Sequence, residues 1–152
     1  SRQNLPVLPG TAALSAEGVA KGAYVLVKEA SDSSDSKPDV ILIGTGSEVT
    51  LCVDAHMKLN ELGIRARVVS MPSWDLFANC SDEDRAGVLI PGVPCLSVEA
   101  ASTFGWARYA QDSIGIDTFG TSAPGDIAMR HFGFTVEAVV ERAQALVSNK
   151  GI

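Results

Sequence analysis

Near its C-terminus the chain reads Gly115-Ile-Asp-Thr-Phe-Gly-Thr-Ser-Ala-Pro-Gly-Asp126, followed by His131-Phe-Gly-Phe-Thr-Val-Glu137. The first stretch is a short apolar strand end that leads into a loop of Gly, Ser and Thr. Pro124 is suited to open a helix after this loop, and Gly133 is suited to end it before a second helix begins. A strand, a loop and two helices in this order are typical of a layered α/β domain.

In the rest of the chain, segments with the hydrophobic pattern of a strand alternate with segments that have the pattern of a helix. The continuous apolar run 40–43 is typical of a strand that is buried on both faces of a parallel sheet. An amphipathic helix is expected over about 48–62, ended by Gly63. We therefore predict an α/β fold, in three α/β/α layers around a mostly parallel sheet of about five strands. The strands are expected at 24–27, 40–43, 65–71, 94–98 and 114–116, and the last helix carries an apolar stripe of Val136, Val139, Val140, Ala143, Leu146 and Val147.

Two helix starts carry capping signals. Thr45 and Glu48 have the spacing of a capping box at the start of the helix expected over 48–62. Ser81 and Asp84 have the same spacing at the start of a short helix that runs to about Leu89. The charge run Asp82-Glu83-Asp84 is then a solvated group of carboxylates at a helix N-terminus and not a catalytic pair.

Length and composition fit one ordinary domain and exclude several functions. The chain has 152 residues, with 12 basic and 18 acidic side chains that give a formal net charge of −6. No nucleic-acid or anionic-membrane partner is expected, because phosphate contacts need clustered Lys and Arg. No apolar run approaches the roughly 20 residues that span a bilayer. No targeting segment is visible, although one that preceded Ser1 could have been cut off.

The cysteines and histidines predict no metal or hydrolytic site. Cys52, Cys80 and Cys95 show no CxxC spacing, and an odd number of cysteines argues against a disulfide framework. We expect buried thiols in a reducing compartment. His56 falls on the apolar side of its helix and is expected to pack there, whereas His131 is expected in the last turn before Gly133. Neither has a second ligand at metal-binding spacing, and no nucleophile elbow is present.

The turn Gly44-Thr-Gly-Ser-Glu-Val49 lies where a dinucleotide fingerprint would lie, between a strand and a helix. Val49 occupies the place of the third glycine, and the strand end at 66–70 carries no acidic residue for a ribose. We therefore expect a tight strand-to-helix turn that needs small residues, and no cofactor.

Two interpretations stay open for Glu99, and two for a set of aromatic residues. Glu99 ends an apolar strand, where ligands of open α/β sheets gather. It has either a structural role, with partners such as Ser102, Thr103 or nearby N–H groups, or a role in an interface or ligand site. The aromatic residues of the loops and short helices form either a cluster under the loops or a face of a subunit contact. They are Trp74, Phe77, Phe104 and Trp106.

Five blocks together give the chain a resemblance that no single block carries. Besides Gly115–Asp126 with the Phe-Gly-Phe-Thr start after it and Gly44–Val49, they are Ser1-Arg-Gln-Asn-Leu-Pro6, Arg67-Val-Val-Ser-Met-Pro72 and Ser97-Val-Glu-Ala-Ala-Ser-Thr-Phe-Gly-Trp106. In this order and spacing the chain closely resembles the C-terminal domain of transketolase over essentially all its residues. The resemblance implies that residues 1–9 are the end of the pyrimidine-binding domain with a linker, that residues 10–152 are the C-terminal domain, and that its first strand is antiparallel.

The resemblance also implies the chemistry of the parent enzyme. A transketolase is a homodimer that transfers a two-carbon ketol unit between sugar phosphates with thiamine diphosphate and Mg²⁺. In the family, the cofactor, metal and catalytic residues belong to the first two domains. This chain is therefore expected to contain no catalytic, cofactor-binding or metal-binding residue, and to be inactive alone. A cytoplasmic location is expected, with a plastid as the alternative.

Arg2 is the one site residue that the resemblance implies for this chain. In transketolases the arginine of the SRQNLP-type segment contacts the phosphate of the sugar-phosphate substrate, and Arg2 matches it. A guanidinium suits this task because its planar fork meets phosphate oxygens with two hydrogen bonds. Thr118 stands where many transketolases carry a basic residue, so the resemblance supports no charge contact there.

Two alternatives stay open at this point. The chain could belong to another thiamine-dependent enzyme with this domain type, either deoxyxylulose-phosphate synthase or the β subunit of a 2-oxo-acid dehydrogenase. It could also be a free-standing nucleotide-binding or protein-interaction module. The SRQNLP start and the GIDTFGTSAP loop favour transketolase.

Overall fold

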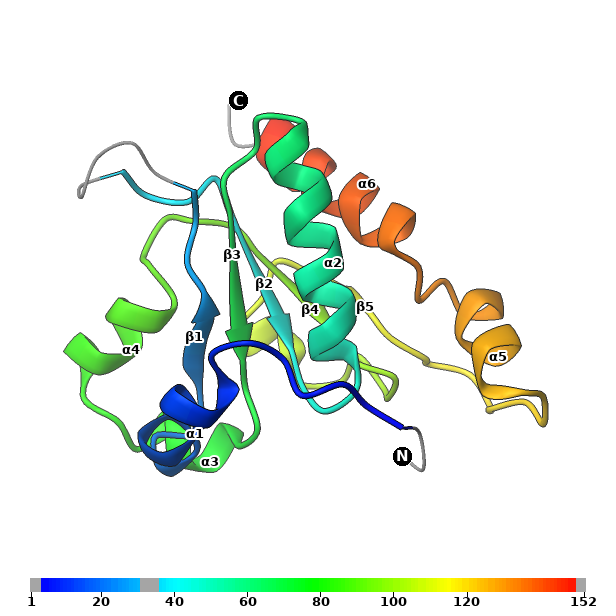
Figure 1. Cartoon of the computed structure of the whole chain (residues 1–152), viewed down its shortest axis with the longest axis horizontal. Coiled ribbons are helices and arrows are strands. Elements are labelled where there is room, and N and C mark those ends of the chain that lie inside the picture. The colour runs from blue at the N-terminus through cyan, green and yellow to red at the C-terminus, as the bar shows by residue number, and fades with distance from the viewer. Residues whose placement is uncertain (1–3, 31–35, 150–152) are drawn as a thin grey trace.

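A five-stranded sheet forms the middle layer of the domain (Figure 1). The computed structural model describes residues 4–30 and 36–149. The strand order is β1-β3-β2-β4-β5; β1 pairs antiparallel with β3, and the other pairs are parallel. The mostly parallel sheet and its antiparallel first strand are thereby confirmed. The strands are β1 (Tyr24–Val27), β2 (Val40–Gly44), β3 (Ala66–Ser70), β4 (Cys95–Val98) and β5 (Asp112–Ile114).

The strand prediction is wrong at β5, which covers Asp112–Ile114 and not 114–116. This strand pairs parallel with β4 over Asp112–Ile114, two of whose three residues are polar, and the Ser97 hydroxyl also donates to the Ser113 hydroxyl at 2.7 Å. After Ile114 the chain leaves the sheet, and the Ile116 N–H donates to the Ala101 carbonyl at 2.8 Å. Apolar content alone therefore places the strand two residues too late.

Helices cover both faces of the sheet (Figure 1). On one face lie α2 (Glu48–Glu61) and α6 (Val136–Ser148), and a core of Val, Leu, Ile and Ala side chains fills the space beneath them. On the other face lie α3 (Trp74–Ala78), α4 (Asp82–Val88) and the 3-10 helix η1 (Trp106–Arg108), over a second core. The predicted stripe of the last helix is confirmed, since its six residues are buried or half-buried. The helix α5 (Gly125–His131) connects the loop after β5 to α6, and His131 lies in its last turn as predicted.

One of the two predicted caps is present. The Ser81 hydroxyl accepts the Asp84 N–H at 3.1 Å at the start of α4, as expected. The capping box at Thr45 is wrong, because α2 begins after Ser47 and the Thr45 carbonyl, not its hydroxyl, accepts the Glu48 N–H at 3.2 Å. Gly46 has a φ of 56°, which is not a helical conformation. Residue 46 therefore cannot be the first residue of a helix that Thr45 would cap.

The helix α1 (Thr11–Ala20) lies between the N-terminal segment and β1. This helix is absent from the elements predicted above, and its segment shows no apolar stripe of period 3.6. Only Gly18 is buried, and a Cβ at this position would lie 2.4 Å from the ring of Tyr24. The close approach of α1 to β1 therefore depends on a glycine.

Gly22 returns the chain from α1 to the sheet and offers a test of this packing. Its φ is 79°, and a Cβ there would lie 2.4 Å from both the Phe77 nitrogen and the Ser73 oxygen. Gly63 has a similar φ of 76°, but a Cβ there would meet open space. We expect Gly22→Ala to lower the free energy of unfolding by about 2–3 kcal/mol, and Gly63→Ala by about 1 kcal/mol, in urea titrations. If both variants lost the same free energy of unfolding, the positive φ alone would account for the loss, and the close contacts at Gly22 would contribute nothing.

Candidate functional site

The carboxyl ends of β2, β3 and β4 meet at one edge of the sheet, where α2 begins (Figure 1). The loops that follow β4 and β5 lie at the same edge, because these strands run parallel. Ligands of open α/β sheets bind at such edges. The side chains that we group here as the carboxyl edge are Glu48, Glu99, Phe104 and Asp117, which lie in the first turn of α2, at the end of β4 and in the loops after β4 and β5.

The turn between β2 and α2 is as tight as predicted. A Cβ on Gly44 would lie 3.0 Å from the Cys52 sulfur and 3.0 Å from the Val49 Cα. Small residues are therefore required for α2 to start against the end of β2.

Glu48 is a buried carboxylate in the first turn of α2, with 5% of its surface exposed. It accepts the Ser47 hydroxyl at 2.6 Å and the Ala100 N–H at 3.3 Å. A negative charge is favoured at a helix N-terminus, where backbone N–H groups point outward. Glu48 thereby connects the start of α2 to the loop after β4 and gives this end of the helix a negative charge.

Glu99 is a half-buried carboxylate at the end of β4. Burial raises its pKa, and the nearby charge of Glu48 raises it further. The predicted partners are wrong: Ser102 and Thr103 bind another carboxylate, and the Ala100 N–H binds Glu48. Within residues 4–30 and 36–149, no donor forms a hydrogen bond to the Glu99 carboxylate.

Asp117 joins the loops that follow β4 and β5. It accepts the Ser102 hydroxyl at 3.0 Å, and it accepts the N–H and the hydroxyl of Thr103, each at 2.8 Å. The Thr103 N–H is the main reason that the pKa of Asp117 is lowered, and the two hydroxyls add to it. Sequence reasoning missed this role, because only the register of β4 against β5 brings these residues together across 14 positions.

The loop aromatics divide into two groups. The Trp74 ring lies 4.9 Å from the Trp106 ring in an edge-to-face arrangement, and Phe77 and Trp106 are each 2% exposed. For these three residues the interpretation as a cluster under the loops is confirmed. Phe104 lies apart from them and is 89% exposed, and Phe119 is 99% exposed.

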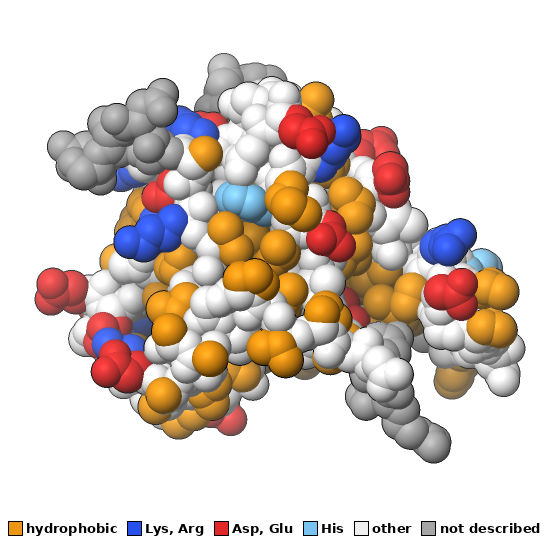
Figure 2. All heavy atoms as spheres, in the orientation of Figure 1, with side chains coloured by type: hydrophobic (Ala, Val, Ile, Leu, Met, Phe, Trp, Pro, Cys, Tyr) orange, Lys and Arg blue, Asp and Glu red, His pale blue; other side chains and the backbone are white. Residues whose placement is uncertain are grey.

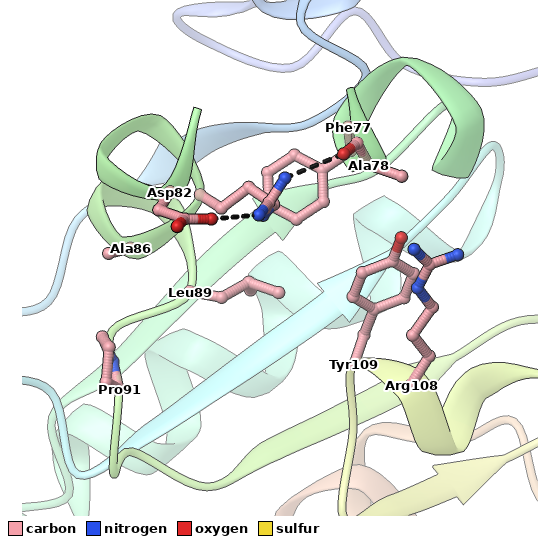
Figure 3. Close-up of a pocket in the computed structure, with 9 residues that line it drawn as sticks. Phe77, Ala78, Asp82, Ala86, Leu89, Pro91, Arg108 and Tyr109 are labelled. Carbon is pink, nitrogen blue, oxygen red and sulfur yellow. Dashed lines mark hydrogen bonds and ion pairs between the residues drawn. The ribbon is translucent and has the colours of Figure 1, made fainter. Parts of the chain in front are cut away.

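A cleft of about 450 Å³ lies on the opposite face of the sheet, between α3, α4 and η1 (Figure 3). Arg85 donates to the Ala78 carbonyl at 2.8 Å and is paired with Asp82, so its charge is neutralised. Arg108 lies beside Tyr109, with its guanidinium carbon 5.5 Å from the ring centre (Figure 3). The residues that line the cleft include no nucleophile next to a base.

Of the other residues singled out from the sequence, His56, Cys52 and Cys95 pack inside the domain. The buried ring of His56 lies between the Ala66 carbonyl, 2.8 Å from Nδ1, and the Asn60 amide, 2.8 Å from Nε2. Burial lowers its pKa, and a neutral ring satisfies both contacts, so the packed histidine is confirmed. Cys52 and Cys95 are buried thiols, and burial raises the pKa of Cys95 to about 12. Arg2 lies outside the described residues.

Neither a metal cluster nor a membrane helix is found in the described ranges. Residues 4–30 and 36–149 contain no group of three or more His, Cys, Asp or Glu side chains that could hold a metal ion. In this part of the chain, no helix is both long and apolar enough to cross a bilayer.

Comparison with known families gives one assignment for most of the chain. The family model described as "Transketolase-like TK C-terminal domain" matches residues 22–135. A transketolase from Halalkalibacterium halodurans is 47% identical over 99% of this chain and 22% of its own length. Transketolase-1, chloroplastic, from Arabidopsis thaliana is 50% identical over 95% of this chain and 19% of its own length. The chain thus spans about a fifth of the length of these relatives.

Solved structures agree with this assignment. A transketolase from Leishmania mexicana superposes with a TM-score of 0.89 at 41% identity, over all of this chain and 21% of that one. A transketolase from Pichia stipitis in complex with sedoheptulose-7-phosphate superposes with a TM-score of 0.86 at 44% identity, over 97% of this chain and 21% of that one.

Proposed function

The chain belongs to the transketolase family and corresponds to its C-terminal domain, and from this we propose that the complete protein transfers a two-carbon ketol unit between sugar phosphates. The observation that carries the proposal is identity of 41–50% to transketolases over nearly the whole chain. Such identity favours transketolase over the other thiamine-dependent enzymes and over a free-standing module. The sugar phosphate in the Pichia stipitis complex supports the substrate class.

The proposed role of this chain is that of a scaffold without cofactor contacts. The described residues do not fit thiamine diphosphate, because Glu48 already occupies the first turn of α2 and Glu99 lies beside it. A diphosphate at this helix start would meet two carboxylates. The proposal therefore places thiamine diphosphate and Mg²⁺ in the preceding domains of the complete enzyme, where the cofactor would stabilise the transferred carbanion.

Further parts of the proposal concern the assembly. We place the end of the pyrimidine-binding domain and a linker at residues 1–9, and the C-terminal domain at 10–152. We also propose a homodimer of the complete chain, in the cytoplasm or in a plastid. The plastid alternative is supported by relatives named chloroplastic, such as the one from Arabidopsis thaliana.

Separate assays of the complete protein and of the isolated chain test whether this chain by itself has activity or binds the cofactor. We expect the complete protein to form sedoheptulose 7-phosphate from pentose phosphates, and the isolated chain 1–152 to have no activity. In calorimetry with Mg²⁺, the isolated chain should show no heat of thiamine diphosphate binding above dilution. Micromolar binding, equivalent to about −8 kcal/mol, would contradict the scaffold role.

Arg2→Ala in the complete enzyme tests the proposed phosphate contact. A charge-assisted hydrogen bond is worth about 1.5–3 kcal/mol, so kcat/KM for phosphorylated donors should fall roughly ten- to a hundredfold. An unphosphorylated donor lacks the partner group and should lose little. Arg2→Lys should recover part of the loss, since it keeps the charge but not the fork. Equal losses for both donors would show that Arg2 has a structural role instead.

A further inference from the structure

Asn60, in the last turn of α2, carries a buried polar atom without a partner. Its side-chain oxygen, Oδ1, is buried and forms no hydrogen bond within residues 4–30 and 36–149. These ranges contain no other buried side-chain oxygen or nitrogen of this kind. An unpaired buried acceptor is unfavourable, so a second contact must hold the amide in this orientation.

The ring of His56 is that contact. Its Nδ1 lies 2.8 Å from the Ala66 carbonyl oxygen, which can only accept, so Nδ1 carries a hydrogen. In the neutral ring Nε2 is then an acceptor, and the Asn60 amide nitrogen donates to it at 2.8 Å. The Asn60 oxygen therefore points away from the ring and stays unpaired.

Protonation of the ring reverses the requirement at Nε2. This atom becomes a donor, and it then faces an amide nitrogen that can also only donate. A half-turn about the last side-chain bond of Asn60 exchanges the amide oxygen and nitrogen without moving the backbone. We propose that His56 and Asn60 form a proton-operated switch, in which Nε2 takes up one proton, the Asn60 amide turns over and Oδ1 accepts the new N–H.

Each state of the switch combines a favourable bond with an unfavourable term. The neutral state pairs Nε2 but leaves Oδ1 buried and unpaired. The protonated state gains a charge-assisted hydrogen bond to Oδ1, which is stronger than the neutral bond that it replaces. Burial of the charge opposes this state. Both states keep the bond from Nδ1 to Ala66, so the ring stays between α2 and β3.

Burial sets the pH range of the switch. It lowers the pKa of His56, while the hydrogen bond to Ala66 and the charge of Glu29 act in the opposite direction. A histidine whose pKa is lowered in the folded state contributes stability that is fully present above its unfolded pKa of about 6.5. This stability is lost as the pH falls through the folded pKa. The switch therefore turns in acid, below about pH 6.5.

The charged groups on the strand side of the ring are paired with one another. Glu29, which follows β1, acts on the ring through its charge, and Arg67 of β3 binds both of its carboxylate oxygens. The pKa of Glu29 is lowered by Arg67, so this carboxylate stays ionised where His56 titrates. Arg65, which precedes Ala66, binds Asp39. His56 is thus the group that changes its charge here in mild acid.

The other surroundings of the ring are mostly apolar. The positions three and four residues away on α2 carry no charge, and they are Cys52, Val53, Leu59 and Asn60. The strand β2 and the helix α6 present apolar side chains to α2. Asp54 is exposed, and Lys58 is paired with Glu61 at 2.7 Å on the exposed side of the helix. Figure 2 shows hydrophobic side chains gathered over α1 and the neighbouring part of α2, with most charged side chains towards the edge of the view.

NMR spectroscopy of the chain 1–152 observes the two states directly. Above about pH 7, ¹⁵N spectra should show a hydrogen on Nδ1 of His56 and none on Nε2, and NOEs should join the ring to the Asn60 amide hydrogens. As the ring is protonated, Nε2 should gain a hydrogen and these NOEs should be lost. NOEs between His131 and Phe132, whose rings lie 5.0 Å apart, serve as the control and should persist. Asn60 NOEs that keep their strength would overturn the switch, and so would a ring that stays neutral until the domain unfolds.

Two variants separate the switch from a simple packing contact. Asn60→Leu has neither donor nor acceptor, and it should lower the proton affinity of the His56 ring about tenfold, because the lost charge-assisted bond is the stronger one. Asn60→Asp can only accept, and it should raise this affinity by about tenfold or more. Asn79→Leu at the exposed end of α3 should leave it unchanged. Shifts in the same direction for both variants at residue 60, or none, would overturn the switch. Neither experiment involves ketol transfer, so its outcome is separate from that of the proposed activity.

Discussion

Val140→Asp is expected to prevent folding or to lower the free energy of unfolding by about 4 kcal/mol or more. Val140 lies in the stripe with which α6 packs against α2 and the sheet, next to the buried residues Val139 and Ala143. The variant would put a carboxylate among these side chains, with 8% exposure for the residue that it replaces. An unpaired charge in such a place costs several kcal/mol, or forces protonation.

Ala145→Asp is the matched control for this variant. It adds the same charge to the same helix, but Ala145 is exposed. Urea unfolding should show a loss of at most about 0.5 kcal/mol for the control. A similar small loss for Val140→Asp would mean that this face of α6 is not buried in solution.

Elements with a continuous apolar run or a clear apolar stripe could be predicted from the sequence, and elements with neither could not. The run 40–43 is apolar at every position and becomes buried on both faces of the sheet, and the apolar stripe of α6 becomes the side that faces the core. The helix α1 has apolar residues all round, and β5 begins with Asp112 and Ser113. In both cases the contact that decides the structure is tertiary, because Tyr24 packs on Gly18, and Ser97 binds Ser113.

At the candidate site, the positions of single residues could be predicted from the sequence, but their hydrogen-bond partners could not. The position of Glu99 at the end of a strand could be predicted, and so could the general need for partners. Its neighbours in the sequence, Ser102 and Thr103, were reasonable candidates, but they bind Asp117 from the next loop. The Ala100 N–H binds Glu48, which lies 52 positions away. Partners of this kind depend on the register of three strands, and the spacing of residues along the chain does not contain that information.

A buried ion pair joins three elements on the edge of the sheet that carries β1. Arg67 of β3 donates from Nε and Nη2 to the two carboxylate oxygens of Glu29, each at 2.8 Å. Its third nitrogen donates to the carbonyls of Gly87 at 2.9 Å and Val88 at 3.3 Å, at the end of α4. The side chains of Arg67 and Glu29 are 9% and 11% exposed.

Arg67→Ala should lower the free energy of unfolding by about 3–5 kcal/mol. The variant leaves the Glu29 carboxylate buried without its counter-charge and removes the donor to both carbonyls. Arg65→Ala is the matched control, because Arg65 binds Asp39 through two nitrogens in the same way but is 41% exposed. Its loss should be a small fraction of the Arg67 loss, since solvent screens an exposed pair. Replacing Arg67 and Glu29 together by Met should cost less than Arg67→Ala alone, because no unpaired charge remains.

The pH dependence of this loss identifies its ionic part. The hydrogen bonds from Arg67 lower the pKa of Glu29 in the folded state below its unfolded value of about 4.3. A lowered pKa contributes stability that is fully present above the unfolded pKa and is lost as the pH falls through the folded one. The difference in unfolding free energy between the parent chain and Arg67→Ala should therefore be constant above about pH 6 and shrink steadily below about pH 4. A difference that stays the same down to about pH 3 would mean that Arg67 stabilises the domain through packing and the two carbonyls, and not through the charge of Glu29.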